Sequence, residues 1–213
     1  GMRGTEKHDR VAELLEMVGL DPDYAGRFPS ELSGGERQRV SIARAFAAKP
    51  DIILCDEVLS ALDTVVAARV LDLMRELREQ HQVAYVFISH DLSTVASIAD
   101  RVAVMYAGRI IDAGLTREVF APPHHPYTQL LINSVPALRQ GWLEEVTASR
   151  EAEAGMRSNV MLHDIPCPFR MRCPVMIEGK CDVESAPRQE MGDHHTVYCQ
   201  HSESELLEAQ DHP

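Results

Sequence analysis

Apolar residues along the chain follow two patterns, one typical of amphipathic helices and one of buried strands. In three segments, apolar or helix-forming residues recur at helical spacing, and the first two of these segments end where glycine or proline follows. We therefore predict helices over residues 9–20, 32–48 and 64–80.

Continuous apolar runs lie on either side of the third predicted helix. Ile52–Cys55 and Val83–Ile88 are rich in β-branched residues, which is typical of strands buried on both faces of a parallel sheet. A strand, a helix and a second strand form the crossover unit of an α/β fold. A short helix that begins after Asp91 and runs to Ala99 is expected to follow, and then two further strands, Val102–Tyr106 and Arg109–Ala113, after which the sheet is expected to end.

Composition and charge restrict the partners of the chain. Its 213 residues are 45% apolar, enough to bury a core, and 33 acidic residues against 21 Lys and Arg give a net charge of −12. Such a field repels phosphate backbones, so we expect no nucleic-acid partner. No apolar run approaches the roughly 20 residues that span a bilayer. The start of the sequence also lacks the apolar core of a secretory signal, so a cytosolic setting with reduced thiols is expected.

The most specific motif is Leu32-Ser33-Gly34-Gly35-Glu36-Arg37-Gln38-Arg39, at the start of a predicted helix. A helix N-terminus leaves bare N–H groups and partial positive charge that can hold a phosphate, although Ser-Gly-Gly by itself is more often a simple cap. The full string resembles the signature motif of ABC ATPases, in which one subunit's signature contacts the terminal phosphate of ATP held by the other. The resemblance implies nucleotide contacts in trans from Leu32, Ser33, Gly34, Gly35, Glu36 and Gln38.

Two carboxylates, Asp56 and Glu57, follow directly after the first predicted strand. An isolated acidic pair of this kind most often caps the next helix, but the string Ile52–Glu57 is similar to a Walker B motif. The resemblance implies that Asp56 binds the Mg²⁺ that accompanies ATP, and that Glu57 orients and deprotonates the attacking water. Val58-Leu59 departs from the family's usual Pro-Thr or Pro-Ser at this point and leaves both carboxylates in place.

Two further motifs follow in the order of the same family. Ser60, Ala61, Leu62 and Asp63 stand at the spacing of the D-loop, which the family places at the dimer interface. His90 follows the second strand and is similar to the switch histidine, which as a neutral donor bonds a γ-phosphate oxygen. A lone histidine there would be an ordinary loop residue. Because four motifs occur in order, we predict ATPase chemistry with Glu57 and His90 as catalytic residues.

Two elements of the family are absent from the sequence. No GxxxxGK[ST] string occurs, so no segment supplies the loop and lysine that hold the β- and γ-phosphates, and the glutamine loop is missing as well. We therefore expect a piece of a longer ATPase that by itself neither binds ATP tightly nor hydrolyses it. The expected fold is the parallel-sheet core of a P-loop-type ABC ATPase, without its N-terminal strands.

The segment 122–136, which contains His124-His125-Pro126-Tyr127-Thr128, resembles an extension found in ATPases of dipeptide, oligopeptide and nickel importers. For its two histidines, a loop bracketed by prolines is favoured over a metal site. The resemblance implies a second ABC ATPase subunit, identical or not, transmembrane permease subunits and, indirectly, a solute-binding protein. It places the protein in the cytoplasm on the inner face of the cell membrane and leaves the transported solute open.

Four cysteines crowd the end of the chain with the spacing C-x5-C-x7-C-x17-C, at positions 167, 173, 181 and 199. On ligand type, four thiolates suit tetrahedral zinc and a cubane iron–sulfur cluster equally. The importer ATPases carry a similar pattern associated with a [4Fe-4S] cluster, so the resemblance favours iron–sulfur over Zn²⁺ or free thiols. His194 and His195 are alternative ligands, although solvent-facing loop residues are the favoured reading. Cys55 is expected to be a small buried apolar residue.

Four regions follow from these motifs. Residues 1–30 end a helical subdomain, 31–120 hold the ABC ATPase core, 121–164 form the extension and a helical linker, and 165–213 form a Cys-rich metal-binding module with an acidic tail. A DNA-maintenance ATPase would share the signature, but its long heptad coiled coils are absent. The remaining alternative is a non-catalytic, regulatory fragment with a redox-sensitive iron–sulfur module.

Overall fold

A computed structural model of the chain describes residues 4–135 and 166–211. The chain divides into two compact units, Gly1–Asp91 and Leu92–Pro213. The predicted connector over 144–157, the central part of the 121–164 region, lies outside the described residues. No helix within the two described ranges combines the length and the apolar character needed to cross a membrane.

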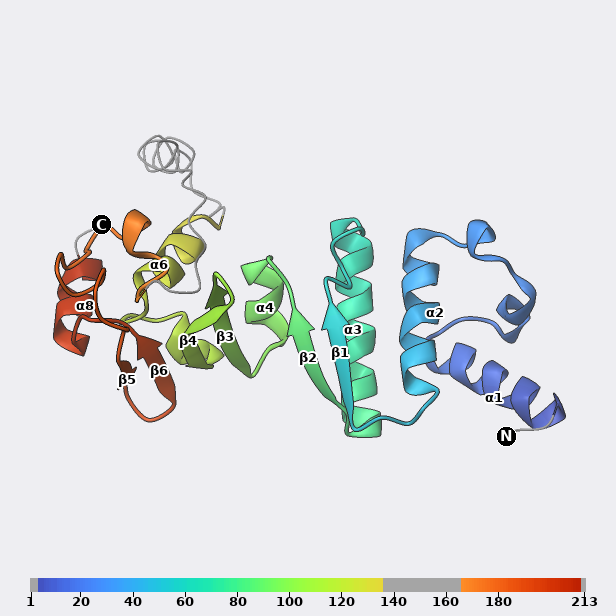
Figure 1. Ribbon diagram of the computed structural model, residues 1–213. Coiled ribbons are helices and arrows are strands. Elements are labelled where there is room, and N and C mark those ends of the chain that lie inside the picture. Colours follow the sequence, from blue (N-terminus) through green and yellow to red (C-terminus); the bar gives the residue numbers. More distant parts are fainter. Residues whose placement is uncertain (1–3, 136–165, 212–213) are drawn as a thin grey trace. The chain divides into compact units, whose positions relative to one another are not determined.

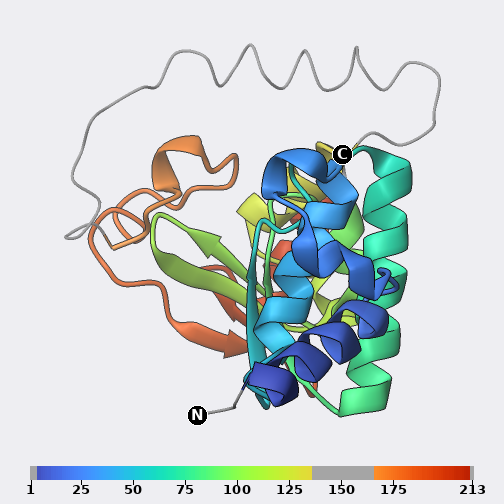
Figure 2. The ribbon, with the colours of Figure 1, turned by 90° about the vertical axis from the view of Figure 1, so that its right-hand side faces the viewer.

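The first unit contains three α-helices and a two-stranded parallel sheet (Figure 1). The strands pair in register from Ile52 with Ala84 to Asp56 with Ile88. Figure 2 shows α1, α2 and α3 of this unit grouped together. These elements confirm the helices and the parallel strand pair predicted from the apolar pattern. Their bounds are α1 Gly4–Met17, η1 Pro22–Gly26, η2 Pro29–Glu31, α2 Gly34–Phe46, β1 Ile52–Asp56, α3 Thr64–His81 and β2 Ala84–Ile88.

The core of this unit lies between one face of the sheet and the helices. Cys55 is buried, as expected, and packs with apolar residues of α1, α2 and α3. The prediction that both strands are buried on both faces is wrong for the described residues, because the helices that pack on the sheet cover only one side. The opposite face carries four apolar side chains that are 48–65% exposed, namely Ile52, Leu54, Val86 and Ile88.

The second unit is built on a four-stranded antiparallel sheet with the strand order β3-β4-β6-β5. The short helix and the two strands predicted after residue 91 are confirmed as α4, β3 and β4. The elements are α4 Leu92–Ile98, β3 Arg101–Tyr106, β4 Arg109–Leu115, α5 Thr116–Val119, α6 Pro126–Asn133, η4 Arg170–Arg172, β5 Arg188–Glu190, β6 His195–Tyr198 and α8 Glu203–Asp211.

The expectation that the sheet ends at β4 is wrong. Strand β6 pairs with β4 from Asp112 opposite Val197 to Gly114 opposite His195, so the C-terminal segment and the β3–β4 hairpin share one sheet. Gly114 permits this approach, since a Cβ there would lie 2.5 Å from the His194 carbonyl oxygen and 2.9 Å from the His195 Cα. The segment from residue 166 is thus joined to β4 by backbone hydrogen bonds.

Candidate functional site

The predicted catalytic residues lie together at the carboxyl ends of β1 and β2. Asp56 is the last residue of β1, Glu57 follows it, and His90 comes two residues after β2 ends. The Oε1 atom of Glu57 lies 3.1 Å from Nδ1 of His90, and the two side chains are 53% and 74% exposed. The carboxylate and the imidazole are open to solvent at the carboxyl ends of parallel strands. They are therefore placed to accept or donate a proton on a molecule bound at this edge of the sheet.

The backbone at Glu57 has an unusual conformation. Its φ is +47°, in the left-handed region that only a few per cent of residues other than glycine adopt. The Glu57 N–H donates to the Ile88 carbonyl oxygen at 3.0 Å, and its own carbonyl accepts from the Ser60 N–H at 3.1 Å and the Ser60 hydroxyl at 2.9 Å. These hydrogen bonds hold the strained residue in place and fix the direction of its carboxylate.

The predicted D-loop forms the turn between Glu57 and α3. Asp63 is the N-cap of α3, and its Oδ1 accepts from the N–H groups of Val65 and Val66 at 3.1 and 3.0 Å. Ser60 and Ala61 are exposed, whereas Leu62 is half-buried against the core. The Asp63 carboxylate therefore stabilises the start of α3 within the chain.

The predicted signature forms the start of α2. Ser33 is the N-cap and makes a capping box with Glu36: the Ser33 Oγ accepts from the Glu36 N–H at 3.3 Å, and Glu36 Oε2 accepts from the Ser33 N–H at 2.7 Å. The N–H groups of Gly34 and Gly35 have no acceptor among the described residues. These two donors at a helix N-terminus are available to an anion.

The glycines also let α2 pack closely on the start of α3. A Cβ at Gly35 would lie 2.7 Å from Cγ1 of Val66, and one at Gly34 would lie 3.4 Å from Cδ2 of Leu62. Signature and D-loop are thus in direct contact. Leu32 is buried and its carbonyl accepts from Arg37, while Gln38 is half-buried.

Glu36 is engaged within the chain through both carboxylate oxygens. While Oε2 bonds to Ser33, Oε1 accepts from the Tyr24 hydroxyl at 2.6 Å. The Tyr24 hydroxyl, followed by the backbone and hydroxyl of Ser33, lowers the pKa of Glu36 to about 2. A direct nucleotide contact by Glu36, as the resemblance implies, would have to share these oxygens. The sequence offered no local sign of the Tyr24 contact.

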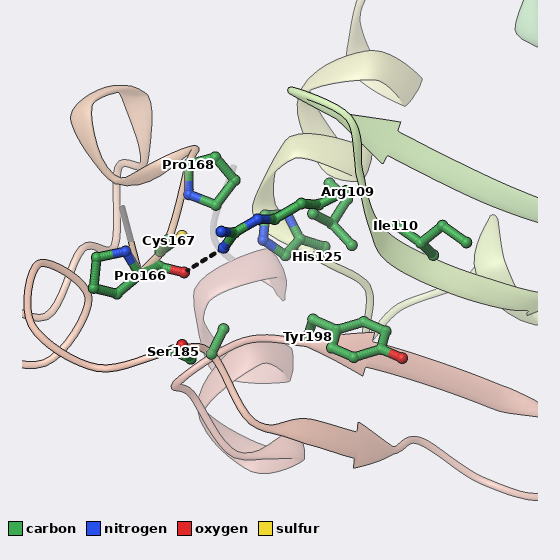
Figure 3. Close-up of a pocket in the computed structure, with 10 residues that line it drawn as sticks. Arg109, Ile110, His125, Pro166, Cys167, Pro168, Ser185 and Tyr198 are labelled. Carbon is green, nitrogen blue, oxygen red and sulfur yellow. Dashed lines mark hydrogen bonds between the residues drawn. The ribbon is translucent and has the colours of Figure 1, made fainter. Parts of the chain in front are cut away.

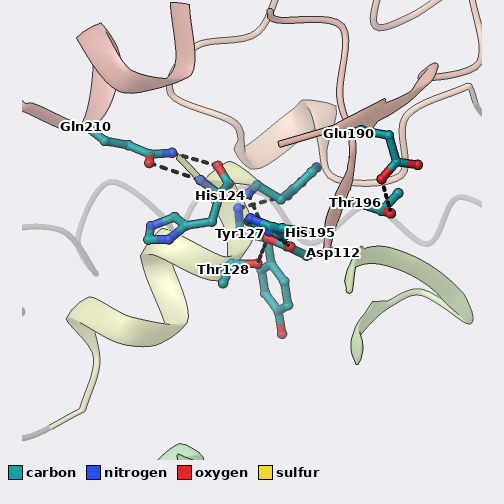
Figure 4. A network of polar contacts seen from close by, with 9 residues as sticks. Asp112, His124, Tyr127, Thr128, Glu190, His195, Thr196 and Gln210 are labelled. Atoms are coloured by element: carbon teal, nitrogen blue, oxygen red, sulfur yellow. Dashed lines mark hydrogen bonds and ion pairs between the residues drawn. The ribbon is translucent and has the colours of Figure 1, made fainter. Parts of the chain in front are cut away.

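A buried polar network in the second unit was missed by the sequence analysis (Figure 4). Asp112, on β4, has no exposed surface; its Oδ1 lies 2.6 Å from Nε2 of His195, and its Oδ2 accepts from the His125 N–H at 2.8 Å and the Thr128 hydroxyl at 2.9 Å. His195 is only 2% exposed, so the solvent-facing reading of this histidine is wrong. The only sequence signal was an acidic residue within the apolar run Ile110–Ala113.

The two histidines of the proline-bracketed segment are buried as well. The N–H and carbonyl of His124 bond to the side-chain amide of Gln210 at 3.2 and 2.7 Å, and its Nε2 lies 2.7 Å from Oε1 of Gln129. Burial lowers the pKa of His125 to about 4, and its Nδ1 accepts from the Tyr127 N–H. These contacts join the segment to α6 and α8 and support the structural reading of both residues.

The four C-terminal cysteines are reduced and lie close enough that their charges influence one another. Burial raises the pKa of Cys173 to about 12 and that of Cys199 to about 11, and it also raises the pKa of Cys167. Cys181 is buried and accepts the Cys167 N–H through its carbonyl. Within 4–135 and 166–211, no group of three or more His, Cys, Asp or Glu side chains is arranged to hold a metal ion.

A small cavity of about 80 Å³ lies beside this segment (Figure 3). Its lining includes His125, Cys167 and Tyr198, and Arg109 crosses it to donate to the Pro166 carbonyl oxygen at 3.3 Å. The cavity therefore lies where β4, the segment after residue 165 and β6 meet.

Comparisons with known proteins agree with these motifs. The family model described as "ABC transporter" matches residues 2–60, and that described as "Oligopeptide/dipeptide transporter, C-terminal region" matches residues 111–181. The oligopeptide transport ATP-binding protein AppF of Bacillus subtilis is 42% identical over 194 residues, 91% of this chain and 58% of AppF. The chain belongs to the ABC transporter family.

Other ABC transporter relatives are named for peptide transport. The probable D,D-dipeptide transport ATP-binding protein DdpF of Escherichia coli is 42% identical over 86% of this chain and 59% of its own length. The dipeptide transport ATP-binding protein DppF of Lactococcus lactis is 47% identical over 62% of this chain and 42% of its own length. The chain therefore spans less than two thirds of each of these three relatives.

A solved structure, the dimeric post-hydrolysis state of the ATP-binding cassette MJ0796 bound to ADP and Pi, is 33% identical. Its TM-score is 0.48, and the match covers 55% of this chain and 50% of that one. The membership in the ABC transporter family rests on the family models and the sequence relatives.

Proposed function

We propose that this chain is part of the ATP-hydrolysing subunit of an ABC importer for peptides or related small solutes. The observation that carries the proposal is the 3.1 Å contact between Glu57 and His90 at the carboxyl ends of two parallel strands. A carboxylate and an imidazole so placed can accept and hold the proton of an attacking water, which is the proton transfer that ATP hydrolysis requires.

The other residues have supporting roles in this proposal. Asp56 offers an oxygen ligand of the type that Mg²⁺ prefers, and the Mg²⁺·ATP complex supplies the phosphoryl group that is transferred. Glu57 deprotonates the water, and His90 donates to a phosphate oxygen. Ser33, Gly34 and Gly35 offer a hydroxyl and two N–H donors to the terminal phosphate of a nucleotide held by a second subunit. The D-loop, Ser60–Asp63, lies between the two sites at the dimer interface.

We infer that a phosphate-binding loop for Glu57 and His90 comes from further polypeptide. The sequence has no GxxxxGK[ST] string, and the relatives are longer than this chain. The exposed apolar face of β1 and β2 supports this inference, since parallel sheets are normally covered on both sides. By the same proposal, the complete protein acts as a dimer with permease subunits on the inner face of the membrane. The names of the relatives favour peptides as its solutes.

Mixing the chain with a complete ABC ATPase subunit tests the signature. The partner keeps its phosphate loop but carries an alanine in place of its own signature serine, so that productive hydrolysis depends on Ser33 of this chain. We expect the chain to be inactive alone, the mixture to hydrolyse ATP, and Ser33→Ala to lower that rate about 100-fold, the effect of removing one transition-state donor. Association without hydrolysis would favour the regulatory alternative instead.

We further propose that the four cysteines hold a [4Fe-4S] cluster, with Zn²⁺ as the alternative. The donor set fits, since four neighbouring thiols are free of disulfides and a bound cation would stabilise their thiolates. Their arrangement does not form a ready metal site, so binding would have to draw the thiols together.

Iron and sulfide analysis of anaerobically prepared protein tests the cysteines. The cluster predicts about four irons and four sulfides per chain with a brown absorbance, and Cys173→Ser is expected to lower both contents. The matched control is Cys55→Ser, because the Cys55 thiol lies in the first unit. This variant is expected to leave the iron content unchanged. Colourless protein with one zinc would end the iron hypothesis.

A further inference from the structure

We propose that Tyr24 is a positioning residue for the signature: its hydroxyl, acting through Glu36, fixes Ser33 in the orientation that binds the terminal phosphate of the partner's nucleotide. This inference rests on the proposed function of the signature and deepens it. Tyr24 lies outside the signature string and bonds to Glu36 within it.

The contacts form a chain of three side chains. The Tyr24 hydroxyl donates to Glu36 Oε1 at 2.6 Å, and Oε2 of the same carboxylate accepts from the Ser33 N–H at 2.7 Å. The Ser33 Oγ in turn accepts from the Glu36 N–H at 3.3 Å. The capping box thus holds both the backbone and the hydroxyl of Ser33 against Glu36.

These contacts restrict the side-chain torsions of Glu36 and the backbone of Ser33. A carboxylate that bonds through one oxygen can still swing about its side-chain torsions, whereas one bonded through both oxygens is held in a single orientation. With Glu36 held in this way, the backbone of Ser33 and the N-terminal turn of α2 lose much of their freedom to fray. The donors of Ser33, Gly34 and Gly35 are then preorganised before any nucleotide arrives.

Tyr24 is itself well anchored. It lies in η1, packs partly buried against the core of the first unit, and carries the Arg27 guanidinium 3.7 Å above its ring centroid. The hydroxyl is therefore presented from a fixed ring. Removing it by Tyr24→Phe leaves that packing in place.

The first arm of the test uses this chain alone and measures by NMR the pKa of Glu36 and the hydrogen-exchange rate of the Ser33 amide. In wild-type protein the pKa of Glu36 is about 2, so the stability it contributes is present above pH 4.5 and is lost as the pH falls from 4.5 toward 2. In Tyr24→Phe we expect the pKa of Glu36 to rise toward 4.5 and the Ser33 amide to exchange about tenfold faster, the effect of losing a charge-assisted hydrogen bond. Tyr85→Phe is the matched control, because the Tyr85 hydroxyl has no hydrogen-bond partner within residues 4–135 and 166–211.

The second arm uses the mixture with the complete partner subunit described above. Tyr24→Phe is expected to lower the rate constant for hydrolysis about tenfold, and Glu36→Ala similarly. The double variant Tyr24→Phe/Glu36→Ala should be no slower than Glu36→Ala alone, because the hydroxyl acts only through that carboxylate. A merely structural role of Tyr24 would give additive losses, and Tyr85→Phe should again have no effect.

The outcomes separate this inference from the proposed function. If Ser33→Ala leaves the rate unchanged, the signature role fails and this inference fails with it. If Ser33→Ala lowers the rate but Tyr24→Phe does not, only the role of Tyr24 is overturned. An unchanged Glu36 pKa and Ser33 exchange in Tyr24→Phe would overturn it as well, whatever the rates. Coupled losses in both arms support it.

Discussion

ATP hydrolysis is expected to fall by about 10²- to 10⁴-fold when Glu57 is replaced by glutamine in a chimera that joins this chain to the part of AppF that it does not match. The amide keeps the size of the side chain and can still contact His90, but it cannot take the proton of the attacking water. ATP binding should persist, since Glu57 is assigned to the water and Asp56 to the metal. Steady-state hydrolysis and equilibrium ATP binding measure the two quantities.

Two comparisons make this prediction specific. Glu76→Gln changes an exposed carboxylate on α3 and should leave hydrolysis within a factor of two. Glu57→Gln in the mixed assay should also have little effect, because there the hydrolysed nucleotide is held by the partner subunit and meets only the signature of this chain. Retained turnover in the Glu57→Gln chimera would show that another base acts.

The second unit is expected to lose about 3–5 kcal/mol of stability when Asp112 is replaced by alanine, the range for removing one partner of a buried polar pair. The substitution leaves His195, the Thr128 hydroxyl and the His125 N–H buried without their acceptor. Because these groups come from β6 and the α6 region, the loss should disrupt the pairing of β4 with β6. Urea unfolding followed through backbone amide signals of β4 and β6 measures the effect.

Asp193→Asn is the matched control for this second prediction. Asp193 lies exposed in the turn before β6, and its replacement should change stability by less than about 0.5 kcal/mol. Asp112→Asn keeps the shape and one acceptor oxygen but places an amide NH2 where the second oxygen accepted hydrogen bonds, so we expect an intermediate loss. A stability change below 1 kcal/mol in Asp112→Ala would mean that the network contributes little to the sheet.

Much of the first unit followed from local patterns. The apolar runs at 52–55 and 83–88 predicted β1 and β2, and helical spacing predicted α1, α2 and α3. The carboxyl ends of parallel strands meet at one edge of a sheet, so the positions of Glu57 and His90 after two such strands were enough to expect them together. The uncovered face of the sheet could not be foreseen, since the residues of a strand do not reveal what lies against each side.

Local sequence was enough to predict the main helices and strands between residues 9 and 113, the order of the motifs and the type of ligand each residue offers, because these depend on neighbours a few positions away. The tertiary structure alone decided which distant residues share their polar groups. Asp112 and His195 are 83 residues apart, and Tyr24 reaches Glu36 across a loop. A buried polar group needs a partner wherever the fold supplies one, and no local pattern records which residue that will be.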